Sequence, residues 1–260
     1  MRVAAAALGA ALLAACAGAP RTHVGPITGR ASTAGRTFTC SQAGLFVDDG
    51  AGPRWLGDPG LRPFALAAGN AQLLVGGGVP AQSGELALCS LDGRVLQRAR
   101  VADDLVYGVV LATGGECAAA ACADGRVLCL HLPDLAASER WRHGGAALAV
   151  AFAPDGTLLA SGGQDGIVLL GAPGGDDAPR PLADHTAAVT CLCWRDDGKQ
   201  LASGARDGKV RLHDREGRLL YTWQRLGGPV EYLAFAASAL QCTIAGPPGA
   251  PARVLTLDLP

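Results

Sequence analysis

Short apolar runs alternate with polar turns along most of this chain. The clearest examples are residues 147–170, ALAVAFAPDGTLLASGGQDGIVLL, and residues 188–212, AVTCLCWRDDGKQLASGARDGKVRL. Such runs are typical of half-buried strands, and Asp-Gly readily adopts the positive φ angles of a tight hairpin. We therefore predict antiparallel strands that reverse at Asp155-Gly156, Asp165-Gly166, Asp197-Gly198 and Asp207-Gly208. A fourth strand is predicted over residues 218–223, and no segment of useful length has a helical period.

This pattern recurs at an interval of about 41 residues. Glycines separated by 40, 41, 41, 42 and 41 residues mark it: Gly44, Gly84, Gly125, Gly166, Gly208 and Gly249. A unit of this length cannot bury its own apolar face, so the copies must stack. Large residues also alternate with small ones before each marker, as in Val150-Ala151-Phe152 and Leu192-Cys193-Trp194. That alternation predicts a strand held between two neighbouring sheets.

Two copies share a polar signature at equivalent positions. One contains His143, Ser161 and Asp165, and the next contains His185, Ser203 and Asp207. This signature resembles that of WD repeats, the four-stranded blades of a β-propeller. The Trp-Asp pair of that family is replaced by Gly171-Ala172 in the first copy and by His213-Asp214 in the second.

The other copies match the family mainly by period. The copy around Gly125 keeps Asp124 but has Ala102 and Ala120 in place of the His and the Ser. The resemblance implies that His143, Ser161, Asp165, His185, Ser203 and Asp207 form structural networks, with the carboxylate and hydroxyl satisfying a buried imidazole. A hydrolase triad is the alternative. We favour structure, because both serines lie in L-A-S-G without a nucleophile elbow and the set occurs twice.

The predicted fold is all-β, a β-propeller of about six four-stranded antiparallel blades over residues 25–260. Six copies fill residues 16–260, whereas seven need about 290 residues. The last copy stops short of an outer strand, so residues 16–24 are predicted to be a closing strand or a short tether. Residues 22–28 are an alternative inner strand for the first blade. An incompletely closed ring of blades is the alternative to a closed one.

The first residues differ in composition from the rest. Arg2 precedes an uncharged apolar stretch over residues 3–15, the length of a secretory signal core. Leu13-Ala14-Ala15-Cys16 resembles the lipobox of bacterial lipoproteins, which predicts a signal peptide over residues 1–15 and lipidation of Cys16. The predicted location is the cell envelope, on the periplasmic side or at the outer membrane. A soluble secreted form and a cytoplasmic protein are the alternatives.

Charge and cysteine content limit the chemistry further. The 22 basic and 23 acidic residues are scattered and give a net charge of −1, so no nucleic-acid partner is expected. Eight cysteines remain besides Cys16, a number that permits disulfides without revealing their pairing. We favour buried, inert thiols over a metal or redox site. They are Cys40, Cys89, Cys117, Cys122, Cys129, Cys191, Cys193 and Cys242.

By analogy with its family, the chain is predicted to be a non-catalytic scaffold for protein partners. The candidate partner-binding residues, near turns on one face, are Arg142, Gln164, Asp184 and Arg206. The alternatives are a metal-dependent hydrolase or lactonase using the central channel, and a lipoprotein of envelope assembly. Glu231 is the lone acid within a predicted inner strand, and we assign it to a strand edge. No catalytic residue, cofactor, metal or small-molecule ligand is expected.

Overall fold

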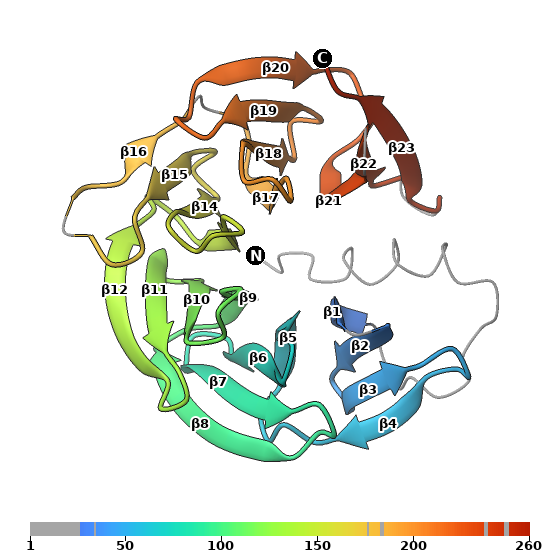
Figure 1. Ribbon diagram of the computed structural model, residues 1–260, viewed down its shortest axis with the longest axis vertical. Coiled ribbons are helices and arrows are strands. Elements are labelled where there is room, and N and C mark those ends of the chain that lie inside the picture. The colour runs from blue at the N-terminus through green and yellow to red at the C-terminus, as the bar shows by residue number, and fades with distance from the viewer. Residues whose placement is uncertain (1–26, 34, 176, 183–184, 237–238, 247–249) are drawn as a thin grey trace.

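The computed structural model describes the chain except for residues 1–26, 34, 176, 183–184, 237–238 and 247–249. Its strands form six antiparallel sheets, hereafter blades 1 to 6, arranged around a central axis (Figure 1). In each blade the strands follow one another in chain order. The predicted all-β propeller with six blades is therefore confirmed.

The first three blades each contain four strands. Blade 1 consists of β1 (Ile27–Thr33), β2 (Arg36–Ser41), β3 (Gly44–Asp48) and β4 (Arg54–Gly57). Blade 2 consists of β5 (Pro63–Ala68), β6 (Gln72–Val79), β7 (Ser83–Ser90) and β8 (Val95–Ala102). Blade 3 consists of β9 (Val106–Leu111), β10 (Cys117–Cys122), β11 (Arg126–His131) and β12 (Ala136–Arg142).

The last three blades contain the two repeats that the sequence makes clearest. Blade 4 consists of β13 (Ala147–Phe152), β14 (Leu159–Gly163), β15 (Val168–Gly171) and β16 (Arg180–Pro181). Blade 5 consists of β17 (Val189–Trp194), β18 (Gln200–Ala205), β19 (Val210–Asp214) and β20 (Leu219–Trp223). Blade 6 has three described strands, β21 (Val230–Ala236), β22 (Ala239–Ile244) and β23 (Arg253–Asp258).

The marker glycines lie at the turn between the second and third strands of a blade. Gly44, Gly125, Gly166 and Gly208 have φ angles between +70° and +125°, which other residues adopt at a cost. Gly84 differs, because it lies inside β7 and the turn falls at residues 80–82 instead. The longer hairpin of blade 2 thus moves the turn while keeping the repeat length. Gly249 lies outside the described residues.

Five apolar clusters fill the spaces between successive blades, from blades 1 and 2 to blades 5 and 6. Each combines side chains from two neighbouring sheets, as the alternation of large and small residues predicts. Within the described residues, no such cluster joins blade 6 to blade 1. Tyr232 of β21 and Val254 of β23 are instead exposed by 52% and 58%. Among the described residues, the hydrophobic core therefore consists of five interfaces between successive blades.

Every inner strand has a register irregularity near its start, where one residue has no partner on the second strand. Such β-bulges redirect a side chain out of the regular alternation. We call these six residues the bulge ring. They are Thr28, Phe64, Tyr107, Leu148, Thr190 and Glu231.

The predictions for the N-terminus lie mostly outside the described residues. These are the signal peptide over residues 1–15, lipidation at Cys16 and the closing strand over residues 16–24. The inner strand of blade 1 spans Ile27–Thr33, which includes the last two residues of the alternative range 22–28, and the rest of that range lies outside the described residues. No helix among the described residues has the length and hydropathy to cross a membrane.

Candidate functional site

A buried polar network connects blades 3 and 4. His143 follows β12, Ser161 lies in β14, and Asp165 lies in the turn between β14 and β15. The Nδ1 atom of His143 is 3.2 Å from both carboxylate oxygens of Asp165, and its Nε2 atom is 2.8 Å from Ser161 Oγ. The indole of Trp141 in β12 donates to the same hydroxyl at 2.8 Å. Four side chains from three chain segments thus meet in one chain of hydrogen bonds.

The chemistry of the groups gives this chain a direction. An ionised carboxylate only accepts, so Asp165 accepts from Nδ1–H of His143. The Nε2 atom then accepts from the Ser161 hydroxyl, which in turn accepts from Trp141. The backbone N–H groups of Gly144 and Ile167 also donate to Asp165 at 2.9 and 3.1 Å. Every polar group is satisfied, as burial of polar atoms requires.

Blade 5 repeats the same arrangement. The Nδ1 atom of His185 is 3.2 Å from the Asp207 carboxylate, and its Nε2 atom is 2.9 Å from Ser203 Oγ. Backbone N–H groups of Thr186 and Lys209 donate to Asp207, each at 3.0 Å. All six residues predicted to form the networks are therefore brought together in two equivalent sets.

The two sets differ in what lies beside the serine. In blade 4 the Trp141 ring lies against Gly171, where an added Cβ would be 3.2 Å from the ring. In blade 5 the equivalent of Gly171 is His213, which is completely buried. Neither ring nitrogen of His213 has a hydrogen-bond partner. Blade 5 therefore has an unsatisfied imidazole where the interface of blades 3 and 4 has a hydrogen-bonded indole.

Burial keeps these histidines neutral. It lowers the pKa of His143 and of His185, and the neighbouring carboxylates offset only part of this effect. Burial also lowers the pKa of His213 to about 4, and the positive charge of Arg211 acts in the same direction. Burial alone raises the pKa of Asp207, but hydrogen bonds from Thr186 and His185 outweigh it and the net shift is downward.

The networks share the hydrogen-bond direction of a hydrolase triad but lack access. Ser161 and Ser203 have no exposed surface. Ser161 is also engaged by the Trp141 N–H, and each Asp holds two backbone N–H groups in a turn. A nucleophile must reach its substrate, and neither hydroxyl does so in this fold. The arrangement instead links the second strand, the following turn and the connection between blades.

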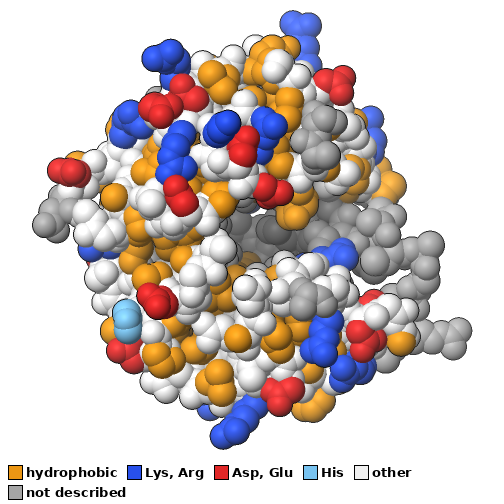
Figure 2. Space-filling model, in the orientation of Figure 1, with side chains coloured by type: hydrophobic (Ala, Val, Ile, Leu, Met, Phe, Trp, Pro, Cys, Tyr) orange, Lys and Arg blue, Asp and Glu red, His pale blue; other side chains and the backbone are white. Residues whose placement is uncertain are grey.

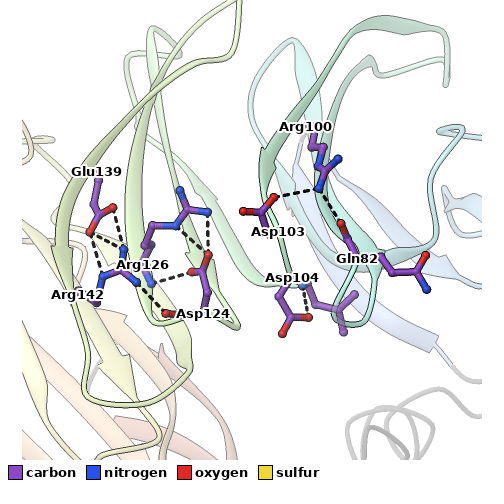
Figure 3. Close-up of polar contacts among 9 residues, drawn as sticks. Gln82, Arg100, Asp103, Asp104, Asp124, Arg126, Glu139 and Arg142 are labelled. Carbon is purple, nitrogen blue, oxygen red and sulfur yellow. Dashed lines mark hydrogen bonds and ion pairs between the residues drawn. The ribbon is translucent and has the colours of Figure 1, made fainter.

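Asp124 of blade 3, which matches the turn aspartates Asp165 and Asp207 by position, uses a different partner (Figure 3). Its carboxylate pairs with the Arg126 guanidinium at 2.7 Å because no histidine is present. Arg126, Arg100 and Asp103 line a shallow depression of about 250 Å³ between blades 2 and 3. Arg100 pairs with Asp103 at 2.9 Å. The charges in this depression are therefore neutralised internally.

The predicted partner-binding residues fall into three groups. Gln164 and Arg206 are exposed in the turns after β14 and β18, which lie at the same end of their blades. Arg142 is held by both carboxylate oxygens of Glu139 and by the Asp124 carbonyl (Figure 3). Asp184 lies outside the described residues. Gln164 and Arg206 thus remain the free members of the set.

All eight cysteines after Cys16 are free thiols. Four are buried, three are partly buried, and Cys117 is exposed. Burial raises the pKa of Cys40 to about 11 and of Cys122 to about 12, so these thiols stay protonated at neutral pH. No cluster of three or more potential metal ligands occurs in the part of the chain that the structure describes.

Two structural roles were missed from the sequence. Trp141 stands two residues before His143, and Ala183 stands two residues before His185, so only comparison of the two copies could have singled out the tryptophan. Glu231 was assigned to a strand edge, but it lies eighteen residues before Gly249, as Thr190 does before Gly208. That spacing places Glu231 in the bulge ring.

Comparisons with known proteins agree with this geometry. The WD domain, G-beta repeat family matches residues 140–170 and 179–214, which cover the two networks. Curated protein sequences gave no match. The crystal structure of the computationally designed Ika8 protein is similar, with a TM-score of 0.73 and 18% identity over 92% of this chain and 73% of that chain. This second likeness concerns the fold alone. The protein is a six-bladed β-propeller in which blades 4 and 5 match the WD-repeat family model.

Proposed function

We propose that this protein is a non-catalytic scaffold that binds protein partners on the face carrying Gln164 and Arg206. The observation that supports this most is the use of the reactive residue types. His143, His185 and their Ser and Asp partners are buried in interactions that hold blades together, while Gln164 and Arg206 are exposed in turns of two successive blades. A propeller of this kind offers a stiff surface at low conformational cost.

Substitutions on two faces test this proposal. In Arg206→Ala and Gln164→Ala, capture of envelope proteins by the purified protein is expected to weaken at unchanged melting temperature. Lys199→Ala is the matched control, because Lys199 is exposed in the turn between β17 and β18 at the opposite end of its strand. Equal loss in all three variants, or no loss in the first two, argues against this face.

We further propose that the protein is anchored in a bacterial cell envelope through Cys16. The support is the sequence alone: the uncharged stretch over residues 3–15 and the lipobox-like Leu13-Ala14-Ala15-Cys16. Radiolabelled palmitate is expected to label the protein and to be absent from Cys16→Ser. Absence of label from the unaltered protein contradicts the anchor while leaving the scaffold proposal intact.

A further inference from the structure

The outer strand of blade 5, β20, carries a run of exposed apolar side chains at the rim of the molecule (Figure 1). Leu219, Leu220 and Tyr221 are exposed by 43%, 43% and 46%. The rings of Tyr221 and Trp223 meet edge to face, with their centroids 4.9 Å apart. Figure 2 shows hydrophobic and basic side chains next to one another on this part of the rim. Exposed apolar surface of this kind marks a binding site.

One edge of β20 has no neighbouring strand in the described chain, because β20 comes last in the order β17-β18-β19-β20. An edge strand exposes backbone N–H and C=O groups that pair readily with another strand. Residues 219–223, LLYTW, contain no charge, proline or glycine, and Tyr221, Thr222 and Trp223 are residue types favoured in strands. The edge of β20 is therefore suited to pairing with one more strand.

The outer strands of blades 2, 3 and 4 carry features that oppose such pairing. β8 contains Arg98 and Arg100, and β12 contains Glu139 and Arg142. β16 consists of two residues and includes Pro181. Charges, proline and short length are common protections of an edge strand. Residues 219–223 of β20 have none of these protections, which indicates that this edge has a partner.

Arginines lie at both ends of the apolar run. Arg218 precedes it and Arg225 follows it, and both are exposed. Neither forms an ion pair with another described residue. Arg253 of blade 6 lies near the second end, since its Nη2 atom would be 2.8 Å from a Cβ added to Gly227. Positive charge at the ends of the strand favours a partner with acidic residues there.

A second copy of this chain fits the edge poorly. Antiparallel pairing of two β20 strands about their centre would place Arg218 opposite Gln224 and next to Arg225 of the other copy. Parallel pairing would place each arginine opposite itself, and like charges in such positions oppose pairing. A register irregularity also leaves Leu220 without a partner on β19, and a bulge of this kind bends and twists the strand. A flexible segment follows this shape more easily than a rigid second blade does.

We propose that β20 binds an extended segment of a partner protein, which adds a fifth strand to blade 5. Main-chain hydrogen bonds hold the segment along the free edge, its alternate apolar side chains contact Tyr221 and Trp223, and acidic residues at its ends pair with Arg218 and Arg225. This interaction surface lies on the rim and is independent of the proposed binding face with Gln164 and Arg206.

The test titrates the purified full-length protein with blocked, fluorescein-labelled peptides and follows fluorescence anisotropy. Glu-Val-Thr-Val-Thr-Val-Glu is the probe. The first control peptide has lysine at both ends, and the second has proline in place of the central valine. The probe is expected to bind about tenfold more tightly than either control, because lysine reverses the end charges and proline removes a main-chain donor.

Two variants locate the binding on β20. Tyr221→Lys introduces a charge at the centre of the exposed edge, so it should abolish binding at nearly unchanged melting temperature. Arg225→Gln should reduce the preference for the probe over the lysine peptide. Ala137→Lys is the matched control, because Ala137 is also exposed on an outer strand, β12, and this variant should bind like the unaltered protein.

The inference is overturned if the probe does not bind, if either control peptide binds equally well, or if Tyr221→Lys binds like the unaltered protein. A dimer in analytical ultracentrifugation that is lost in Tyr221→Lys would show that a second copy occupies the edge, and this result also overturns it. If the peptide fails while partner capture still depends on Arg206 and Gln164, the strand site is wrong and the scaffold proposal stands.

Discussion

Blades 4 and 5 meet the same structural need with different residues. Both join a buried His and a buried Ser to an Asp of the following turn with nearly equal distances, from 2.8 to 3.2 Å. At the interface of blades 3 and 4, Trp141 fills the space beside the serine and donates to it, and Gly171 leaves room for the ring. In blade 5, His213 stands in place of Gly171 and makes no hydrogen bond.

The comparison shows that neighbouring positions on two blades can exchange roles. In blade 4, the Trp141 ring of blade 3 packs against Gly171. In blade 5, the position of Gly171 is taken by His213, a residue of that blade itself. The first solution satisfies every donor and acceptor, while the second leaves two buried nitrogens unpaired. We therefore expect the two networks to respond differently to substitution and to pH.

The largest difference is expected on truncating the residue that stands beside each serine. Trp141→Ala should lower the free energy of unfolding by about 3–5 kcal/mol, because a large buried ring is lost and Ser161 loses a donor. His213→Ala should cost clearly less, because no hydrogen bond is lost. Urea unfolding of both variants measures this, and equal losses contradict the comparison.

Acid should reveal the unpaired imidazole of blade 5. Its folded-state pKa of about 4 lies below the ordinary value of 6.5, so only the unfolded chain takes up a proton as the pH falls between these values. The stability present above pH 6.5 should therefore decrease by roughly 3 kcal/mol on reaching pH 4 from this group.

Unfolding curves at several pH values check this expectation. His213→Leu should flatten the decrease, whereas His131→Gln, which alters an exposed histidine, should leave it unchanged. The smaller downward shifts of His143 and His185 remain in both variants and act in the same direction. An identical slope in His213→Leu and the unaltered protein refutes the assignment to His213.

The two carboxylates should also differ, though less. Asp207→Ala is expected to cost about 2–3 kcal/mol, because it leaves the His185 ring and two backbone N–H groups without an acceptor. Asp165→Ala should cost less, since its side chain is 17% exposed against 4% for Asp207 and water can replace more of its bonds. Thermal unfolding at pH 7 ranks the two, and a reversed order contradicts this burial argument.

The smallest expected change in stability comes from replacing the unpaired imidazole of blade 5. His213→Leu should raise the free energy of unfolding at neutral pH by about 1 kcal/mol, because an apolar side chain of similar size leaves no unsatisfied nitrogen. Gly171→Leu at the equivalent position should destabilise, since its side chain would clash with Trp141. Destabilisation by His213→Leu would show that the imidazole has a partner in solution.

Much of the fold could be predicted because the turn residues and the apolar strand pattern recur at the same interval. The Asp-Gly pairs of blades 4 and 5 lie at strand reversals, and the interval of about 41 residues gave six blades. The exception was Gly84, which lies within β7 because the hairpin of blade 2 is longer. The repeat length gives the number of residues in a blade, but it does not determine which of those residues form the turn.

The residues of the polar networks could be predicted only where two repeats have the same residue types at equivalent positions. His143, Ser161 and Asp165 could be paired with their counterparts in blade 5 by spacing alone. Trp141 could not, because its partner Ser161 lies on the next blade and the pairing depends on how two sheets pack. Which predicted surface residues are free also depended on packing, since Arg142 is held by Glu139 and Asp124.

The sequence by itself determined the number of blades, their strand pattern and the Asp-Gly turns of blades 4 and 5, because these depend on local backbone preferences and on a regular alternation of apolar residues. Tertiary structure decided that five apolar clusters of the described residues join successive blades, that His213 is buried without a partner, and that Glu231 joins the bulge ring. Those properties arise from contacts between blades, where the surroundings of a side chain come from residues far away in the chain.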